Sequence, residues 1–177
     1  MEYEIIEEKA GLIAKLHTDE SCDVECPLDW EQEAVKFLTW ERNSTLSDYN
    51  DMEREEVERL GNLKQYSLFP LYKYEHGGVA YSVGGFSCPW DSGQVGYVLV
   101  IDAQVGGDPR EAAQGVCDQV TSWCNGDIWG FTVEDEEGEE LYSCWGFIGD
   151  TDYVKKAARD HLDGLIKERG EQLELTI

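Results

Sequence analysis

Residues 66–102 read YSLFPLYKYEHGGVAYSVGGFSCPWDSGQVGYVLVID, and this stretch decides the fold class. Two runs rich in β-branched and aromatic residues flank Gly77 and Gly78, which tolerate the positive φ angles of a tight turn. The final eight residues are apolar enough for the central strand of a sheet. The stretch therefore predicts an antiparallel hairpin, a long polar loop and a buried strand.

Upstream of this stretch, the sequence predicts three more strands and a helix. Residues 2–19 contain two apolar runs divided by a turn, which is typical of a hairpin, and residues 33–42 alternate like a strand. Residues 48–62 predict a short, very acidic helix. Ser47 or Asp48 can cap its start and Gly61 can end it.

Downstream, two helical segments enclose another hairpin. Residues 108–126 begin with an Asp-Pro pair suited to a helix start, and they end with Asn-Gly. Residues 127–149 predict a hairpin that turns around Gly138, and residues 152–170 predict a last helix. Together these elements predict an α+β fold: a single domain over residues 1–177, mainly an antiparallel sheet of about six strands, with two or three helices.

Acidity is the strongest global feature of the chain. It has 38 acids against 14 bases, a net charge of −24. Such a field disfavours direct binding to nucleic acid or an anionic membrane, and it speeds encounter with basic partners. Residues 1–65 hold 18 acids and 7 bases, whereas residues 66–131 hold only 7 and 2. The acidity is therefore separate from the polar loop and can serve a different purpose.

The expected location is the cytoplasm of a host cell. No stretch approaches the roughly 20 apolar residues of a membrane span, and the first residues are acidic where a signal peptide is basic. The six cysteines are then expected to be free thiols. His17, Cys22 and Cys26 have loose spacing and lack a fourth ligand, so neither a metal nor a cofactor is predicted.

The central stretch also carries a family resemblance. FSCPWDSGQVG at residues 86–96 and CWGF at residues 144–147 are the most specific parts of a similarity that covers roughly residues 66–149. In these motifs the chain resembles a family of small uncharacterised proteins from bacteriophages, prophages and related mobile elements. The resemblance implies a mobile-element setting and no particular chemistry.

The loop that contains this motif has three interpretations. It can be an Ω-like loop held by its own side chains, or a binding pocket in which Trp90 forms an aromatic platform beside polar groups. It can also be the active site of a thiol-dependent enzyme, with Cys88 as nucleophile, His76 as base and Asp91 as orienting group. Tyr74, Tyr81 or Tyr97 could complete the pocket. Its candidate residues are His76, Phe86, Ser87, Cys88, Trp90, Asp91, Ser92 and Gln94.

Two acidic segments form a second candidate site. One is the hairpin tip at residues 134–140 and the other is the helix predicted from Asp48. They are either solvated surfaces or an imitation of duplex phosphates, which are about 3.4 Å apart along one strand. Adaptation to high salt is a further alternative. The candidate residues are Asp51, Glu55, Glu58, Glu134, Asp135, Glu136, Glu137, Glu139 and Glu140.

These observations rank three functions. The first is an acidic phage-type accessory protein without enzymatic activity. It would inhibit a basic, nucleic-acid-directed host defence factor, as anti-restriction, anti-CRISPR and DNA-mimic proteins do. The second is a small-molecule or nucleotide-binding module that uses residues 86–94, possibly to sequester a defence signal. The third is a thiol-dependent enzyme.

Overall fold

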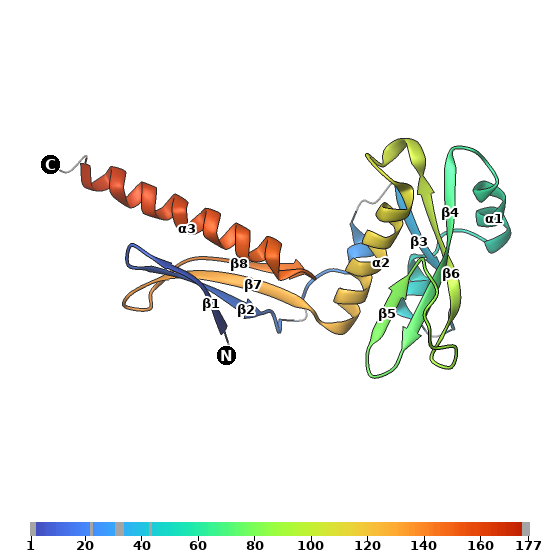
Figure 1. Cartoon of the computed structure of the whole chain (residues 1–177), viewed down its shortest axis with the longest axis horizontal. Helices are drawn as coiled ribbons and strands as arrows, with labels where there is room; N and C mark the ends of the chain where they lie inside the picture. Colours follow the sequence, from blue (N-terminus) through green and yellow to red (C-terminus); the bar gives the residue numbers. More distant parts are fainter. Residues whose placement is uncertain (1–2, 22, 31–33, 43, 175–177) are drawn as a thin grey trace. The chain divides into compact units, whose positions relative to one another are not determined.

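The computed structural model describes residues 3–21, 23–30, 34–42 and 44–174, except for the side chains of residues 171–174. The chain divides into two compact units (Figure 1). Unit 1 comprises Met1–Val24 and Gly126–Ile177, and unit 2 comprises Glu25–Asn125. Each unit has its own sheet and its own core.

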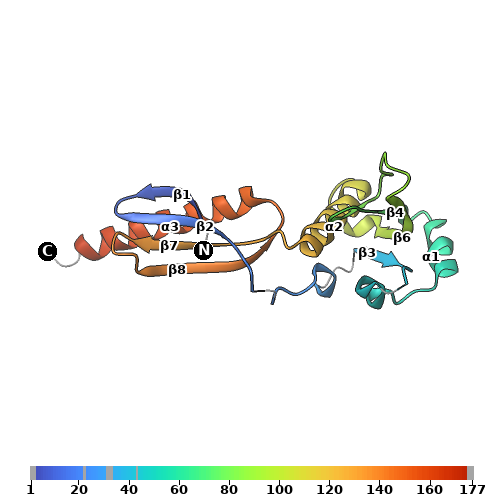
Figure 2. The ribbon, with the colours of Figure 1, turned by 90° about the horizontal axis from the view of Figure 1, so that it is seen from below.

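Unit 1 is a four-stranded antiparallel sheet with one long helix on one face (Figures 1 and 2). The strand order is β1-β2-β7-β8, so the first hairpin of the chain pairs with the last one through β2 and β7. The strands are β1 (Tyr3–Lys9), β2 (Leu12–Thr18), β7 (Ile128–Asp135) and β8 (Glu140–Ile148), and the helix is α3 (Thr151–Glu174).

The core of unit 1 follows from the two periodicities of sheet and helix. Along β2, Leu12, Ala14 and Leu16 point to one face, because side chains alternate on a strand. They pack with Phe131 and Val133 of β7. Residues four apart on α3 supply the other side of this core, namely Val154, Ala158 and Leu162.

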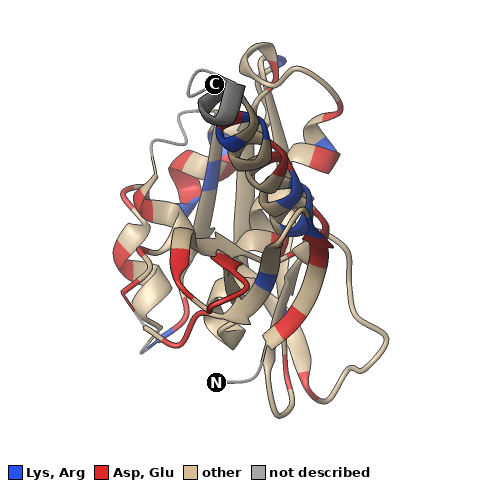
Figure 3. Cartoon of the chain, turned by 90° about the vertical axis from the view of Figure 1, so that its left-hand side faces the viewer, with Lys and Arg blue, Asp and Glu red and all other residues tan. Residues whose placement is uncertain are grey.

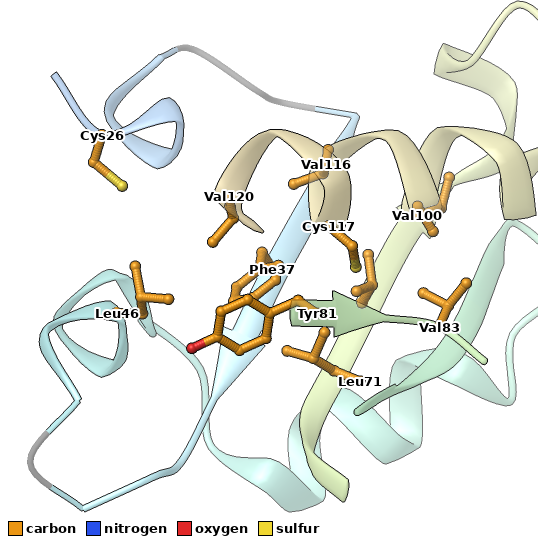
Figure 4. Packing of buried hydrophobic residues seen from close by; sticks show 12 residues of the cluster. Cys26, Phe37, Leu46, Leu71, Tyr81, Val83, Val100, Val116, Cys117 and Val120 are labelled. Carbon is orange, nitrogen blue, oxygen red and sulfur yellow. The ribbon is translucent and has the colours of Figure 1, made fainter. Parts of the chain in front are cut away.

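Unit 2 is a second four-stranded antiparallel sheet, with helices on both faces. Its strand order is β3-β6-β4-β5, which makes β6 the central strand that the sequence predicted. Helix α2 packs on one face around Phe37 and Tyr81 (Figure 4), and helix α1 packs on the other. The elements are β3 (Val35–Thr39), α1 (Arg54–Gly61), β4 (Tyr66–Glu75), β5 (Val79–Ser82), β6 (Ser92–Ile101) and α2 (Pro109–Asn125).

The predicted α+β class is confirmed, but the predicted sheet is wrong in its strand number. The described residues form eight strands in two sheets, where about six strands in one sheet were expected. Hairpins are visible in the sequence because their strands are neighbours. The pairings that join hairpins, such as β2 with β7, link residues more than 100 positions apart and leave no local pattern. None of the described helices is long and apolar enough to cross a membrane.

The acidic helix begins later than the sequence predicted. Residues Thr45–Tyr49 form a 3-10 helix, in which the Ser44 side chain accepts a hydrogen bond from the Leu46 backbone N–H. The Asn50 side chain then accepts from the Met52 N–H, which turns the chain, and α1 starts only at Arg54. The buried Leu46 side chain fixes this first turn in the core. Asp51 therefore precedes the helix.

Candidate functional site

The loop between β5 and β6 is held by hydrogen bonds at both ends. At its start, the Gln114 side chain of α2 accepts from the Val83 N–H at 3.1 Å. At its end, the Ser92 hydroxyl donates to the Cys88 carbonyl at 2.5 Å, and the Cys88 thiol donates to the Asp91 carboxylate at 3.2 Å. The loop therefore has a defined shape that presents residues 88–92 together.

The aromatic residues of the loop have roles that the sequence did not assign. The Phe86 ring lies 5.6 Å from the Tyr74 ring, which attaches the loop to β4. Trp90 is 92% exposed, so it does not stabilise the loop by burial. Tyr81 belongs to the core of unit 2 and is not next to Trp90, whereas Tyr97 lies against Trp40 near α1. Ser87 is exposed, and His76 contacts the loop through Asp91.

Asp91 is the centre of the three residues proposed for thiol chemistry. Its Oδ2 atom lies 3.2 Å from the Cys88 sulfur and 3.7 Å from Nδ1 of His76. A thiol nucleophile needs its base next to the sulfur, with the orienting carboxylate behind that base. Here the carboxylate stands between thiol and imidazole, so the order of the three groups differs from that of a nucleophilic triad.

Two hollows flank the start of β6. The first, of about 370 Å³, is bounded by Glu41, Trp90 and Asp91. The second, of about 340 Å³, is bounded by Glu41, Arg54 and Tyr97. Residues 90–93 of the motif line the first hollow, Gln94 and Gly96 line the second, and Val95 lines both. The Gln94 amide donates to the Gly96 carbonyl at 3.2 Å. The motif thus provides a wall shared by two hollows.

Glu41 and Lys73 belong to this site although the sequence did not identify them. The Lys73 ammonium lies 3.2 Å from Oε1 of Glu41 and 2.8 Å from Glu75. Burial favours a lower pKa for Lys73, but its hydrogen bonds to Glu75 and Glu41 outweigh burial and raise that pKa. The other Glu41 oxygen, Oε2, is buried and has no hydrogen-bond partner among the described residues. Only one of the two carboxylate oxygens of Glu41 therefore has a partner among the described residues.

The last glycine of the motif, Gly96, is explained by the packing of the sheet. A Cβ atom on Gly96 would lie 1.9 Å from the Leu38 carbonyl oxygen of β3. By contrast, a Cβ atom on Gly93 would meet nothing within 4 Å. Gly96 thus allows close contact between β6 and β3, the strand that ends two residues before Glu41.

The second motif, CWGF, lies within β8 of unit 1, where the strand has a β-bulge. The register of β7 and β8 shifts opposite Gly130, where the Trp145 ring lies over the glycine. Gly146 has φ of +84°, and its N–H donates to the buried Asp19 carboxylate at 3.1 Å. The conformation of CWGF is thereby explained by packing and hydrogen bonding.

Comparison with known proteins adds no relative. No protein-family model, curated protein or solved structure matches the chain. Any function of the site is therefore inferred from its geometry.

The acidic tip of unit 1 is the turn between β7 and β8, and its six carboxylates divide into two groups. Glu134 pairs with Lys15, and this hydrogen bond lowers its pKa. The Asp135 side chain accepts from the Glu137 and Glu139 N–H groups, both at 2.9 Å, and so holds the turn. Four side chains are exposed and form no ion pair within the described part of the chain: Glu136, Glu137, Glu139 and Glu140.

Two carboxylates of β1 are paired with bases of α3. Glu4 of β1 lies 2.9 Å from Lys155 of α3, and Glu7 lies 3.5 Å from Arg159. Figure 3 shows several Lys and Arg (blue) along α3, and Asp and Glu (red) in the loops. Bases of α3 thus pair with two glutamates of β1, whereas in the acidic tip only Glu134 is paired with a base among the described residues.

In unit 2, the predicted acidic residues lie on two elements. Asp51, before α1, lies 2.9 Å from Lys36, and this hydrogen bond lowers the Asp51 pKa. On α1, Glu58 pairs with Arg54 at 3.1 Å and also accepts from the Tyr97 hydroxyl. Glu55 is exposed. Two of these three carboxylates are therefore already neutralised by neighbouring bases.

The described residues contain no group of three His, Cys, Asp or Glu side chains that could hold a metal ion. Of the weak zinc candidates, Cys22 lies outside the described residues. His17 is buried in unit 1, where its Nε2 lies 3.0 Å from the Thr132 hydroxyl, and Cys26 is buried in unit 2.

Proposed function

We propose that this chain is an acidic inhibitor that binds a basic, nucleic-acid-directed protein of the host and occupies its nucleic-acid site without catalysis. The observation that carries the proposal is the acidic tip, with four exposed carboxylates that no base of unit 1 neutralises. The family resemblance supports a mobile-element setting, in which a host defence nuclease is the natural partner.

Electrostatics explains why such a tip favours binding to a protein over binding to nucleic acid. The total charge of −24 repels phosphates and attracts a positively charged groove. Carboxylates held on a short turn lose little conformational freedom on binding, since Asp135 already fixes the backbone. Complementary charge chiefly accelerates association and selects the partner.

The test is inhibition of DNA cleavage by a panel of purified restriction and RNA-guided nucleases. We expect inhibition at about 0.05 M salt that weakens at about 0.5 M, because salt screens exposed charges. Neutralising the tip by Glu136→Gln, Glu137→Gln, Glu139→Gln and Glu140→Gln should abolish it.

A matched control removes the same charge from scattered exposed positions: Asp23→Asn, Glu111→Gln, Asp160→Asn and Glu168→Gln. This control should inhibit nearly as well as the natural chain. If both quadruple variants lose inhibition equally, only net charge matters. If the natural chain inhibits none of the nucleases, the proposal is refuted.

The second candidate function is a ligand-binding module in unit 2. It is favoured by the hollow of about 370 Å³ that the motif residues line beside Trp90. This volume is within the range of small-molecule sites. In that case Trp90→Ala should abolish activity while the tip variant keeps it, which is the opposite of the first expectation.

A further inference from the structure

We propose that the hollow bounded by Glu41, Trp90 and Asp91 in unit 2 receives an arginine side chain from the basic partner. The inference rests on the proposed function, because it names the specific contact that a basic partner would make. It is argued from the charge of the hollow, an unsatisfied acceptor in its wall and an exposed aromatic ring.

The walls of the hollow carry an excess of negative charge. Glu41, Glu75 and Asp91 face it, and Lys73 is the base that lines it. The Lys73 ammonium is held by both Glu41 and Glu75, and its side chain is only 16% exposed. Lys73 therefore neutralises one charge, and two negative charges remain for a cationic ligand.

Glu41 supplies an acceptor that lacks a donor. Its side chain is 22% exposed, and Oε2 has no hydrogen-bond partner within the described residues. A buried acceptor without a donor is unfavourable, so the carboxylate gains by meeting one. Glu41 is part of the lining of the hollow, so a donor that enters the hollow comes close to this carboxylate.

Trp90 supplies the aromatic face. An indole that is 92% exposed makes almost no contribution to the stability of the fold. Exposed tryptophans are among the residues that contribute most when an interface covers them. Its position next to Asp91 places an aromatic ring and a carboxylate at the mouth of the same hollow.

These features favour arginine over lysine. A guanidinium is planar, stacks on aromatic faces, is weakly hydrated and donates several hydrogen bonds at once. The neighbouring hollow shows the same chemistry within the chain, because Arg54 lies 5.7 Å from the centre of the Tyr97 ring and pairs with Glu58 at 3.1 Å. In the first hollow the corresponding cation would come from the partner.

The test uses the full chain and the tripeptide acetyl-Gly-Arg-Gly-amide, followed by NMR of the tryptophan indole N–H groups and of the backbone N–H groups of residues 91–93, which report binding in the variant that lacks Trp90. We expect saturable shifts at the Trp90 signal, identified through Trp90→Ala, and weaker binding of the lysine tripeptide. Loss of the aromatic contact should weaken arginine binding about fivefold. Trp30→Ala, at another exposed tryptophan of unit 2, is the matched control and should bind normally.

Glu41→Gln should also weaken binding, by about tenfold, because a charged hydrogen bond is lost. If this variant does not fold, Asp91→Asn tests the same electrostatic contribution at a less buried position. Equal binding of the arginine and lysine tripeptides, or unchanged binding in Trp90→Ala, would overturn the inference. Free arginine has the same net charge as the tripeptide, so tighter binding of free arginine than of the tripeptide would overturn the assignment to a protein partner.

The nuclease assay separates this inference from the function on which it rests. Inhibition that survives in Trp90→Ala and Glu41→Gln but is lost in the tip variant would leave the inhibitor role standing and refute the arginine site. Arginine binding at Trp90 without inhibition of any nuclease would support the site and refute the inhibitor role.

Discussion

Replacing Gly96 by alanine should destabilise unit 2 strongly. The new methyl carbon would lie 1.9 Å from the Leu38 carbonyl oxygen and 2.9 Å from the Thr39 Cα atom. All of these are main-chain atoms of the adjacent strand, so no side-chain rotation can relieve the clash. The strands β3 and β6 must separate by more than an ångström, and the ladder hydrogen bonds near Thr39 are lost.

The magnitude follows from two contributions. Overpacking of a buried site costs about 1 to 3 kcal/mol, and each net hydrogen bond lost adds about 1 kcal/mol. Gly96 pairs with Thr39 at the end of this ladder, and the loss of about two bonds there gives a total near 3 to 5 kcal/mol. The assay is urea unfolding followed by circular dichroism and tryptophan fluorescence.

Gly93→Ala is the matched control, since nothing lies within 4 Å of its Cβ position on the same strand. It should change the free energy of unfolding by no more than about 0.5 kcal/mol. A loss of less than about 1 kcal/mol in Gly96→Ala would refute the close approach of β3 and β6. It would also remove the explanation for the last glycine of the motif.

Three further predictions concern buried side chains. Burial raises the pKa of Cys117 to about 12, so at pH 8 iodoacetamide should modify Cys88 long before Cys117, as measured by mass spectrometry of digests. Burial lowers the pKa of His17. The His17 imidazole is therefore protonated at a higher pH in the unfolded chain than in the folded chain. The free energy of unfolding of the natural chain should therefore fall, relative to His17→Gln, as the pH drops below about 6.5, whereas a difference independent of pH would contradict the assignment. Phe131→Ala removes a fully buried ring from unit 1 and should cost about 3 to 5 kcal/mol in urea unfolding, and a cost below about 1 kcal/mol would contradict its place in the core.

Most secondary structure was predictable because its signals are local. The three hairpins were identified from turn glycines between β-rich runs, and Gly138 lies at the expected turn with φ of +83°. The helix cap at Asp108 was also expected, and its side chain accepts from the Arg110 N–H at 2.9 Å. Such signals depend only on residues close in sequence.

The start of the acidic helix was not predictable by the same reasoning. Residues 45–53 contain several side chains that can cap a helix, and each gives a similar local signal. The burial of Leu46 decides among them, and burial depends on residues far along the chain. Long-range packing thus overrode the local pattern.

The candidate site was predictable in part. The sequence singled out the loop, and in the structure Asp91 lies next to both Cys88 and His76. It could not identify Glu41, because one glutamate among 38 acids has no distinguishing pattern. It also could not show that Trp90 is exposed, since an aromatic residue in a loop is as compatible with packing as with recognition.

The pairing of β2 with β7 has a consequence for synthesis on the ribosome. Thr18 pairs with Trp129, so the amino-terminal hairpin must wait for its partner strand while unit 2 is being translated. At ordinary elongation rates this delay is roughly 5 to 20 seconds. During that time the nascent hairpin presents an open edge at β2, and the glutamates of β1 would discourage its association with other emerging chains.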